Sequence, residues 1–316
     1  MNPREADATG ETLRTFTLPV SDGHSLYVET FGPSDGVPVV HLHGGPGSGA
    51  QPDHRKIFDP ARHRAVLYDQ RGAGRSMPRR SRVANTTAHH IADLEAIRAA
   101  LGIDRWVIAG GSWGATLALA YAQAHPERVA GIVLRATFLG TRAELDRAFL
   151  QNLPTFYPEL YADFLSLLGD DERGDPLASY WRRILNPDPD VHGPAAWAWH
   201  DTERVLSQVS PGKVRLDSVA GRVGPLPSTP FMEAHYFSQD CFLAPNQLLE
   251  NGKRLAGIPG IIVQGRYDLL CPHSTAFALA ERWQNADLRI VEGAGHAMTD
   301  PGIMDAVRSA IAELAA

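Results

Sequence analysis

Short apolar runs that alternate with helical patterns restrict the fold of this 316-residue chain more than any other feature. Four runs are apolar at nearly every position, as strands buried on both faces are: VPVVHL from Val37, AVLY from Ala65, WVIAGG from Trp106 and GIVLRATF from Gly131. Helical patterns separate them, such as residues 88–101, which stop at Gly102. This alternation predicts a mostly parallel, doubly wound α/β sheet.

The alternation is interrupted after Gly140. From there to about Gln247 the chain is rich in aromatic residues, prolines and short helical patterns, and strand patterns return only from Ile258 onward. We therefore expect an α/β core formed by residues 1–139 and 251–316, with a helical cap inserted at 140–250. Near the N-terminus, the pattern from about Phe16 to Thr30 predicts two strands joined by a turn at Asp22-Gly23.

Composition excludes several classes of partner. The chain is 44% hydrophobic and 21% charged with a net charge of −6, and no stripe of Lys or Arg predicts nucleic-acid binding. No apolar run reaches the roughly 18 residues that a membrane span needs. The polar N-terminus has no secretory pattern, and two cysteines, Cys241 and Cys271, are too few for a disulfide scaffold. We expect a cytoplasmic protein with free thiols, and no feature predicts an oligomeric state.

The segment GGSWG, residues 110–114, lies between a predicted strand and a predicted helix. Such a junction can bind a phosphate or present a nucleophilic serine in a strained turn. A phosphate loop would need a lysine where Ala115-Thr116 stand. G-x-S-x-G in this context predicts Ser112 as a nucleophile, although the five residues alone also fit an ordinary tight turn.

A serine nucleophile needs a base and a carboxylate that orients the base. In this motif's fold the partners follow in the order Asp or Glu, then His, after late strands. Asp268 follows IIVQGRY and His296 follows LRIVEGAG. Each alone fits a turn aspartate or a surface histidine, but together they predict a catalytic triad with Ser112.

The tetrahedral oxyanion of such a reaction needs preorganised N–H donors. The strand VPVVHL runs into HGGPG, residues 43–47. We assign the donors to the backbone N–H groups of Gly45 and Trp113, and expect Gly44 to border the substrate. The loop DQRGAGRS from Asp69 is expected to brace this face. His41 and His43 alternate like metal ligands, but no further cluster has ligand spacing, so no metal is predicted.

HGGPG, DQRGAGRS, GGSWG, GRYDLLCP at 265–272 and GAGH at 293–296 together resemble the proline iminopeptidases, or prolyl aminopeptidases, of the α/β-hydrolase superfamily. The similarity runs from about Thr17 to the C-terminus. It implies an α/β-hydrolase core with a helical cap, and release of an N-terminal proline from small peptides or amides. It also implies that no metal or organic cofactor is needed.

The resemblance further implies two cap carboxylates that bind the free amine of the substrate. MEAHYF, residues 232–237, is similar to the family's E-x-H-Y-F stretch and assigns one role to Glu233. Aligning WAWHD, residues 197–201, with W-x-x-W-E assigns the second role to Asp201, one methylene shorter than Glu. Asp201 could instead only decorate its helix. Cys271 matches a cysteine common in the family, for which packing is expected.

Two other functions remain open at this point. The replacement of Trp-Glu by His200-Asp201 fits a specialised amidase or esterase acting on a secondary metabolite. A ligand receptor with low turnover is a third hypothesis, which the intact triad disfavours. Dehalogenase and epoxide-hydrolase chemistry would need a carboxylate at the position of Ser112.

Overall fold

A nine-stranded sheet forms the centre of the protein in the computed structural model, which describes residues 5–6, 12–217 and 225–316. Its order is β1-β2-β3-β5-β4-β6-β7-β8-β9. The pairs from β5 to β9 are parallel, and β1, β2 and β3 add antiparallel strands at one edge. The strands are β1 (Glu5–Ala6), β2 (Thr12–Pro19), β3 (Ser25–Phe31), β4 (Val37–Leu42), β5 (His63–Tyr68), β6 (Trp106–Ser112), β7 (Val129–Thr137), β8 (Gly260–Gly265) and β9 (Ala286–Val291). The predicted sheet is confirmed, and so are the two strands around Asp22-Gly23.

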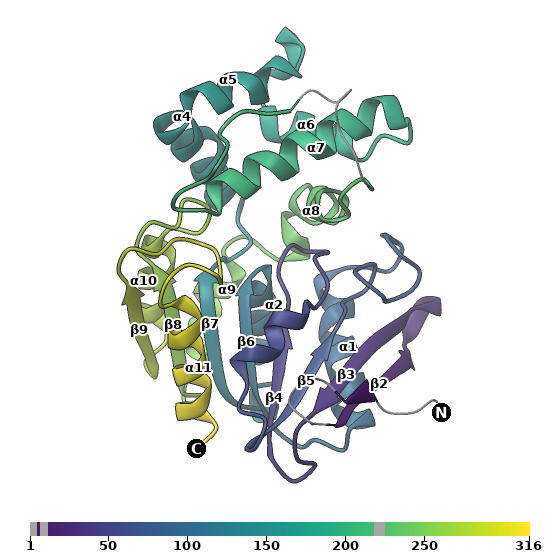
Figure 1. Cartoon of the computed structure of the whole chain (residues 1–316), viewed down its shortest axis with the longest axis vertical. Coiled ribbons are helices and arrows are strands. Elements are labelled where there is room, and N and C mark those ends of the chain that lie inside the picture. The colour runs from purple at the N-terminus through teal and green to yellow at the C-terminus, as the bar shows by residue number, and fades with distance from the viewer. Residues whose placement is uncertain (1–4, 7–11, 218–224) are drawn as a thin grey trace.

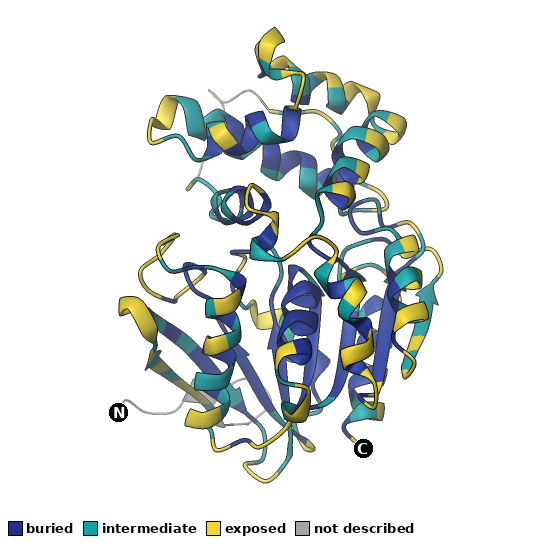
Figure 2. Ribbon diagram, turned by 180° about the vertical axis from the view of Figure 1, so that it is seen from behind, coloured by how far each residue is buried: buried dark blue, intermediate teal, exposed yellow. Residues whose placement is uncertain are grey.

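The central strands are buried on both faces, as their continuous apolar sequences require (Figure 2). Side chains alternate between the faces, so Val40 packs in one hydrophobic cluster and its neighbour Val39 in the other. Helices α1 (Thr87–Ala100), α2 (Trp113–Ala124) and α10 (His273–Arg282) contribute to the first cluster, and α11 (Ile303–Leu314) contributes to the second. Helices on both faces make the sheet doubly wound.

A group of helices lies over one end of the sheet (Figure 1). We call these helices, α3 to α8, the cap. They are α3 (Arg142–Asp146), a π-helical turn (Arg147–Asn152), α4 (Leu153–Phe156), α5 (Pro158–Ser166), α6 (Pro176–Ile184), α7 (Pro189–Leu206) and α8 (Thr229–Phe237). A short helix, α9 (Gln247–Glu250), follows before the chain re-enters the sheet at β8.

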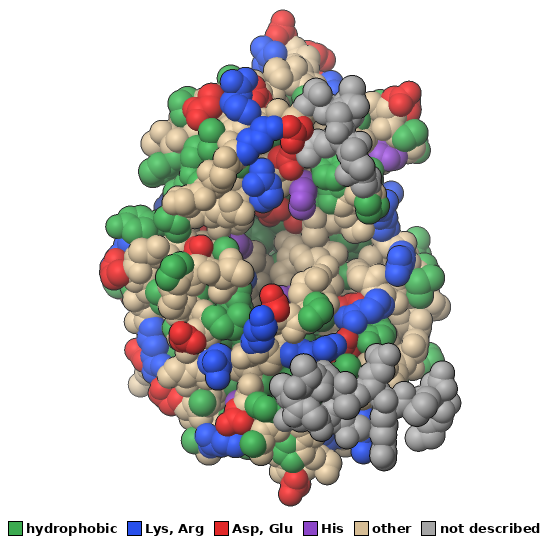
Figure 3. Space-filling view, viewed as in Figure 1, with side chains coloured by type: hydrophobic (Ala, Val, Ile, Leu, Met, Phe, Trp, Pro, Cys, Tyr) green, Lys and Arg blue, Asp and Glu red, His purple; other side chains and the backbone are tan. Residues whose placement is uncertain are grey.

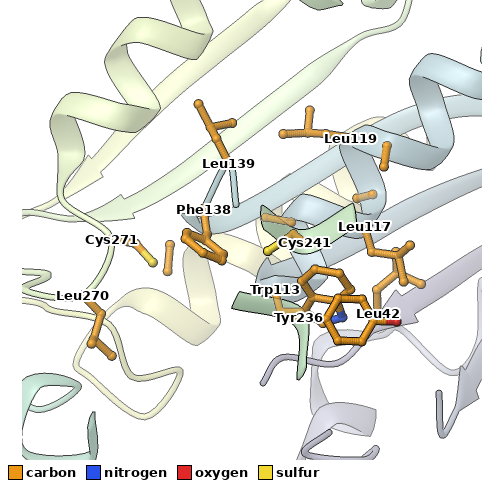
Figure 4. Packing of buried hydrophobic residues seen from close by; sticks show 14 of the residues in the cluster. Leu42, Trp113, Leu117, Leu119, Phe138, Leu139, Tyr236, Cys241, Leu270 and Cys271 are labelled. Carbon is orange, nitrogen blue, oxygen red and sulfur yellow. The ribbon is translucent and has the colours of Figure 1, made fainter. Parts of the chain in front are cut away.

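Helix α8 is hydrogen-bonded directly to the core. Tyr236 donates its hydroxyl to Asn85 Oδ1 at 2.7 Å, and His235 Nε2 lies 2.8 Å from the Asn85 carbonyl. The Tyr236 ring also packs edge-on against Trp113, with 4.6 Å between ring centroids (Figure 4). The position of α8 is therefore tied to the residue that follows Ser112.

Two further expectations concern the cysteines and the membrane. Cys241 and Cys271 are both buried free thiols, as predicted. Among the described residues, no helix combines the length and the apolar character that a membrane crossing requires.

Candidate active site

Ser112 lies at the turn between β6 and α2, in a backbone conformation that residues other than glycine rarely adopt. Its φ is 56° and its ψ is −125°, outside the regions open to most L-residues. Strain of this kind persists only where the surroundings enforce it, and it is typical of functional positions. The turn thus has the geometry of a nucleophile elbow.

The glycines around Ser112 are required by close backbone approaches. A Cβ on Gly110 would lie 2.3 Å from the Gly114 carbonyl oxygen, and one on Gly114 would lie 2.1 Å from the Leu42 oxygen. Both distances are far shorter than a carbon–oxygen contact allows. The glycines of the G-x-S-x-G pattern are therefore needed because β4, β6 and α2 pack too closely here for a side chain.

Asp268 and His296 come from the loops after β8 and β9. His296 Nδ1 lies 3.0 Å from Asp268 Oδ2, and Asp268 Oδ1 accepts hydrogen bonds from the backbone N–H groups of Leu270 and Cys271. These bonds fix the carboxylate, which in turn orients the imidazole with Nε2 left available. His296 and Ser112 line the same cavity.

The HGGPG loop reaches the nucleophile from β4. A Cβ added to Gly44 would lie 3.7 Å from Ser112 Cβ, and both Gly44 and Gly45 line the cavity that holds Ser112. The N–H of Trp113 belongs to the first turn of α2, where backbone donors have no partner within the helix. The two assigned oxyanion donors thus lie on either side of Ser112, one in the HGGPG loop and one in the first turn of α2.

Gln70 connects the HGGPG loop to the start of α2. It lies in the DQRGAGRS loop, which is expected to brace this face, although the sequence does not single out this residue. Its Nε2 donates to the His43 carbonyl at 2.9 Å, and its Oε1 accepts from Trp113 Nε1 at 2.8 Å. Its backbone N–H also donates to His43 Nε2, while His43 Nδ1 donates to the Gly44 carbonyl. With both nitrogens engaged, His43 has a structural role and is no metal ligand.

Arg135 of β7 is a second residue that the sequence did not point to. Its guanidinium packs against Gly111 and donates to the His296 carbonyl. Burial lowers the pKa of Arg135, and the charge of Asp268 acts in the opposite direction. The side chain lines the active-site cavity and braces the loop that carries His296.

The cap closes the cavity opposite Ser112 with two glutamates. Figure 3 shows a hollow between the cap and the core, and the cavity there has a volume of about 400 Å³. Glu233 of α8 and Glu203 of α7 line it together with Ser112 and His296. Trp199, four residues before Glu203 on α7, donates its indole N–H to Glu233 Oε2 at 2.7 Å.

The two carboxyl groups perturb each other. Burial raises the pKa of Glu233 well above its usual range, and the nearby charge of Glu203 raises it further. Burial also raises the pKa of Glu203, whereas the charge of His296 lowers it. Two carboxyl groups in such contact do not both ionise readily, and a cation placed between them would favour the ionised form of both.

The second carboxylate differs from the one predicted. Asp201 does not line the cavity: its side chain is largely buried, with Oδ1 4.0 Å from Arg204 Nε. Residues two apart on a helix point to opposite sides, whereas Trp199 and Glu203, four apart, share a face. The sequence alignment was therefore shifted by two residues. If W-x-x-W-E is aligned from Trp199 instead, Thr202 stands where the motif has its second tryptophan, and Glu203 stands at the position of the glutamate.

Among the described residues, one group of three has metal-ligand spacing. It consists of Asp268, Cys271 and His296, whose ligand atoms lie within 4.8 Å of one another. In this group the carboxylate and the imidazole already bond to each other, and burial raises the pKa of the Cys271 thiol well above its usual range. The group therefore has the chemistry of a triad with a packed, protonated cysteine.

Comparison with known proteins places this site in a family. Residues 37–301 match the alpha/beta hydrolase fold family. Proline iminopeptidases from Xylella fastidiosa and Neisseria meningitidis are 42% and 41% identical over 293 and 301 residues, covering 92% and 94% of this chain and 93% and 94% of theirs. The chain belongs to the proline iminopeptidase family. A plant proline iminopeptidase, from Arabidopsis thaliana, is 41% identical over 307 residues, covering 96% of this chain and 80% of its own.

Solved structures agree on the fold of this proline iminopeptidase family member. A proline iminopeptidase-related protein from Thermus thermophilus has a TM-score of 0.61 at 23% identity, covering 96% of this chain and 98% of its own. An esterase from Rhodococcus sp. has a TM-score of 0.54 at 20% identity, covering 96% and 99%. At these identities the likeness shows the α/β-hydrolase fold alone, since the same fold carries several chemistries.

Proposed function

We propose that this protein is a prolyl aminopeptidase, a serine hydrolase that releases an N-terminal proline from small peptides or amides. The observation that carries the proposal is the pair formed by the half-buried Glu203 and the buried Glu233, which line one cavity with Ser112 and His296. Buried carboxylates without a cation are costly, and a substrate ammonium group offsets that cost. The free amine of a first residue therefore fits this pocket.

In the proposed reaction, Ser112 Oγ attacks the carbonyl carbon of the first residue while His296 Nε2 accepts its proton. The N–H groups of Gly45 and Trp113 donate to the oxyanion. The intermediate then collapses: the C–N bond breaks, His296 protonates the leaving amine and an acyl-enzyme remains. Water, deprotonated by His296, hydrolyses the ester and releases the amino acid. Asp268 holds the imidazole throughout.

The amine pocket determines where the substrate is cut. With the ammonium group between Glu203 and Glu233, only the carbonyl of the first residue reaches Ser112. A blocked amine cannot supply the charge, and it leaves the carboxylates without a partner. This arrangement excludes cleavage inside a chain and accounts for exopeptidase specificity.

The test compares proline amide, alanine amide and N-acetylproline amide as substrates of the wild type. We expect kcat/KM to be highest for proline amide and to fall by about 100-fold or more when the amine is acetylated, since a buried charge loses its partner. Equal turnover of blocked and free substrates would contradict the aminopeptidase proposal. A simple acyl ester turned over as well as proline amide would favour the amidase or esterase hypothesis.

Two variants test which acidic residue of α7 binds the substrate amine. Glu203→Gln is expected to lower kcat/KM for proline amide by about 100-fold, because the charge facing the amine is lost. Asp201→Asn is the matched control on the same helix. It keeps the size of the side chain and does not touch the cavity, so kcat/KM should change less than about threefold. Turnover of an ester without an amine should survive in both. Labelling of Ser112 by a fluorophosphonate separates this enzyme from a receptor without turnover.

A further inference from the structure

A second cavity of about 560 Å³ adjoins the active-site cavity. The two share three lining residues, Ser48, His200 and Thr229, so they lie next to each other at the boundary between cap and core. The remaining lining of the second cavity is Gly47, Gly72, Gly74, Arg79, Arg80 and Ser228. The second cavity therefore lies where the part of a peptide beyond the scissile bond could extend from the active site.

The two cavities differ in charge. In the first, Glu203 and Glu233 stand beside two arginines, Arg135 and Arg204. Among the described residues that line the second, two are arginines and none is acidic, so only the second has an excess of positive charge. Basic side chains border the core side of the hollow in Figure 3. A short peptide with free ends carries the complementary charges: an ammonium group at its first residue, opposite the glutamates, and a carboxylate at its last residue, opposite the arginines.

The loop that carries the arginines is built rigidly. The Arg80 N–H donates to the Gly72 carbonyl at 2.9 Å, and Asn85 Nδ2 donates to the Ser81 carbonyl at 2.8 Å. Arg80 itself has a φ of 57°, a conformation that costs a non-glycine residue energy and that often marks a functional segment. These contacts hold the backbone of the loop in place beside the cavity.

The two arginines have different tasks. The Arg80 guanidinium donates to the Leu226 carbonyl at 2.6 Å and to Ser228 Oγ at 3.2 Å, so it bridges the core loop to the segment before α8. Arg79 is exposed, and within the described part of the chain it makes no hydrogen bond or ion pair. Its charge is the one left to meet a ligand.

We propose that the second cavity is a subsite for the C-terminal carboxylate of short peptide substrates, and that Arg79 binds this carboxylate. The inference rests on the proposed function and narrows its substrate class to short peptides with a free carboxyl end. Guanidinium and carboxylate form a charge-assisted pair, modest in strength where water has access. The expected preference is therefore about 3- to 10-fold, not orders of magnitude.

The experiment measures kcat/KM for prolyl-glycine, prolyl-diglycine and prolyl-triglycine, each with a free and with an amidated C-terminus. The wild type should prefer the free acid by about 3- to 10-fold at one of these lengths, since each added residue extends the chain by about 3.5 Å. Arg79→Gln should reduce that ratio to about 1, and Arg79→Glu should invert it, while turnover of proline amide stays unchanged. Arg82→Gln, an exposed arginine of the same loop that does not line the cavity, is the matched control and should keep the ratio.

A ratio near 1 in the wild type, or one that Arg79→Gln leaves intact, overturns the carboxylate subsite. The proposal is also overturned if the preference for the free acid is lost in Arg204→Gln but not in Arg79→Gln. Arg204 borders the first cavity, so the carboxylate would then be bound there. Calorimetric binding of the same peptide pairs to Ser112→Ala gives the ratio without turnover. If no prolyl substrate is cleaved, the proposed function fails, and these binding ratios still decide the subsite.

Discussion

The elbow and the amine pocket face each other across one cavity, yet they are built in different ways. The elbow is formed by consecutive residues around Ser112, held by glycines whose close contacts permit no side chain. The amine pocket joins Glu233 and Glu203 from two separate cap helices, and an indole from Trp199 fixes one of them. The reaction is thus set by local backbone geometry, and the substrate by the packing of helices.

This difference predicts that the two halves can be disabled separately. Changes at the elbow should alter turnover of every substrate, whatever its amine. Changes in the amine pocket should alter only substrates that carry one. The following variants test this separation in order of expected size.

The largest effect is expected from Ser112→Ala. Removing the nucleophile should lower kcat by about 10⁶-fold, the order seen when a triad serine is removed. Because the side chain is small and the strain lies in the backbone, the fold and the amine pocket should remain. Steady-state kinetics with a prolyl anilide gives the rate, and calorimetry with proline amide gives the affinity. A variant that keeps a tenth of the activity would show that the elbow is not the reacting centre.

A smaller effect is expected from Gln70→Leu, which removes the side-chain hydrogen bonds that connect the HGGPG loop to Trp113. The variant leaves the buried Trp113 indole N–H without its acceptor and frees the His43 carbonyl. We expect kcat to fall by about 10- to 100-fold for amine-bearing and amine-free substrates alike, with KM within about threefold, because misplaced oxyanion donors affect the transition state.

Gln70→Glu supplies the control for this variant. It restores the acceptor for Trp113 but not the donor for His43, so its kcat should lie between those of wild type and Gln70→Leu. A loss confined to KM, or to substrates with an amine, would contradict the assignment of Gln70 to the elbow half.

The same contrast explains what the sequence could predict. The buried strands and the positions of Ser112, Asp268 and His296 follow local patterns, since a buried strand and the loop after it are neighbours in the chain. The carboxylate that pairs with Glu233 cannot be identified from such a local pattern. Asp201 and Glu203 are both acidic and two residues apart, and only the rotation of α7 decides which one faces the cavity.

Gln70 and Arg135 were missed for a related reason. Neither belongs to a motif with a catalytic meaning, and each acts through contacts with residues distant in sequence. Gln70 meets Trp113 and His43, and Arg135 meets His296. The sequence patterns indicated the candidate triad and the loop that contains Gln70, but not the individual side chains that hold the triad in place.

The smallest effect is expected in stability, from Glu233→Gln. The pKa of Glu233 is raised in the folded protein, so above the ordinary value of 4.5 the folded state holds a proton that the unfolded chain has lost. The stability of the wild type should therefore fall as pH rises from about 4.5 toward the raised pKa. The neutral glutamine removes this dependence, and we expect a gain of about 1–2 kcal/mol at about pH 7.5 that vanishes near pH ~4. Urea unfolding at both pH values measures the difference.

Glu281→Gln, on the exposed surface of α10, is the matched control and should change stability equally at the two pH values. If Glu233→Gln behaves like this control, then Glu233 is not held protonated in the free protein, and the amine pocket is not under electrostatic strain. If it is more stable than the wild type only at neutral pH, the pocket is destabilised in the absence of substrate. The elbow and the amine pocket then share one property: each is held in an unfavourable state by its surroundings, the elbow through its backbone and the pocket through its charge.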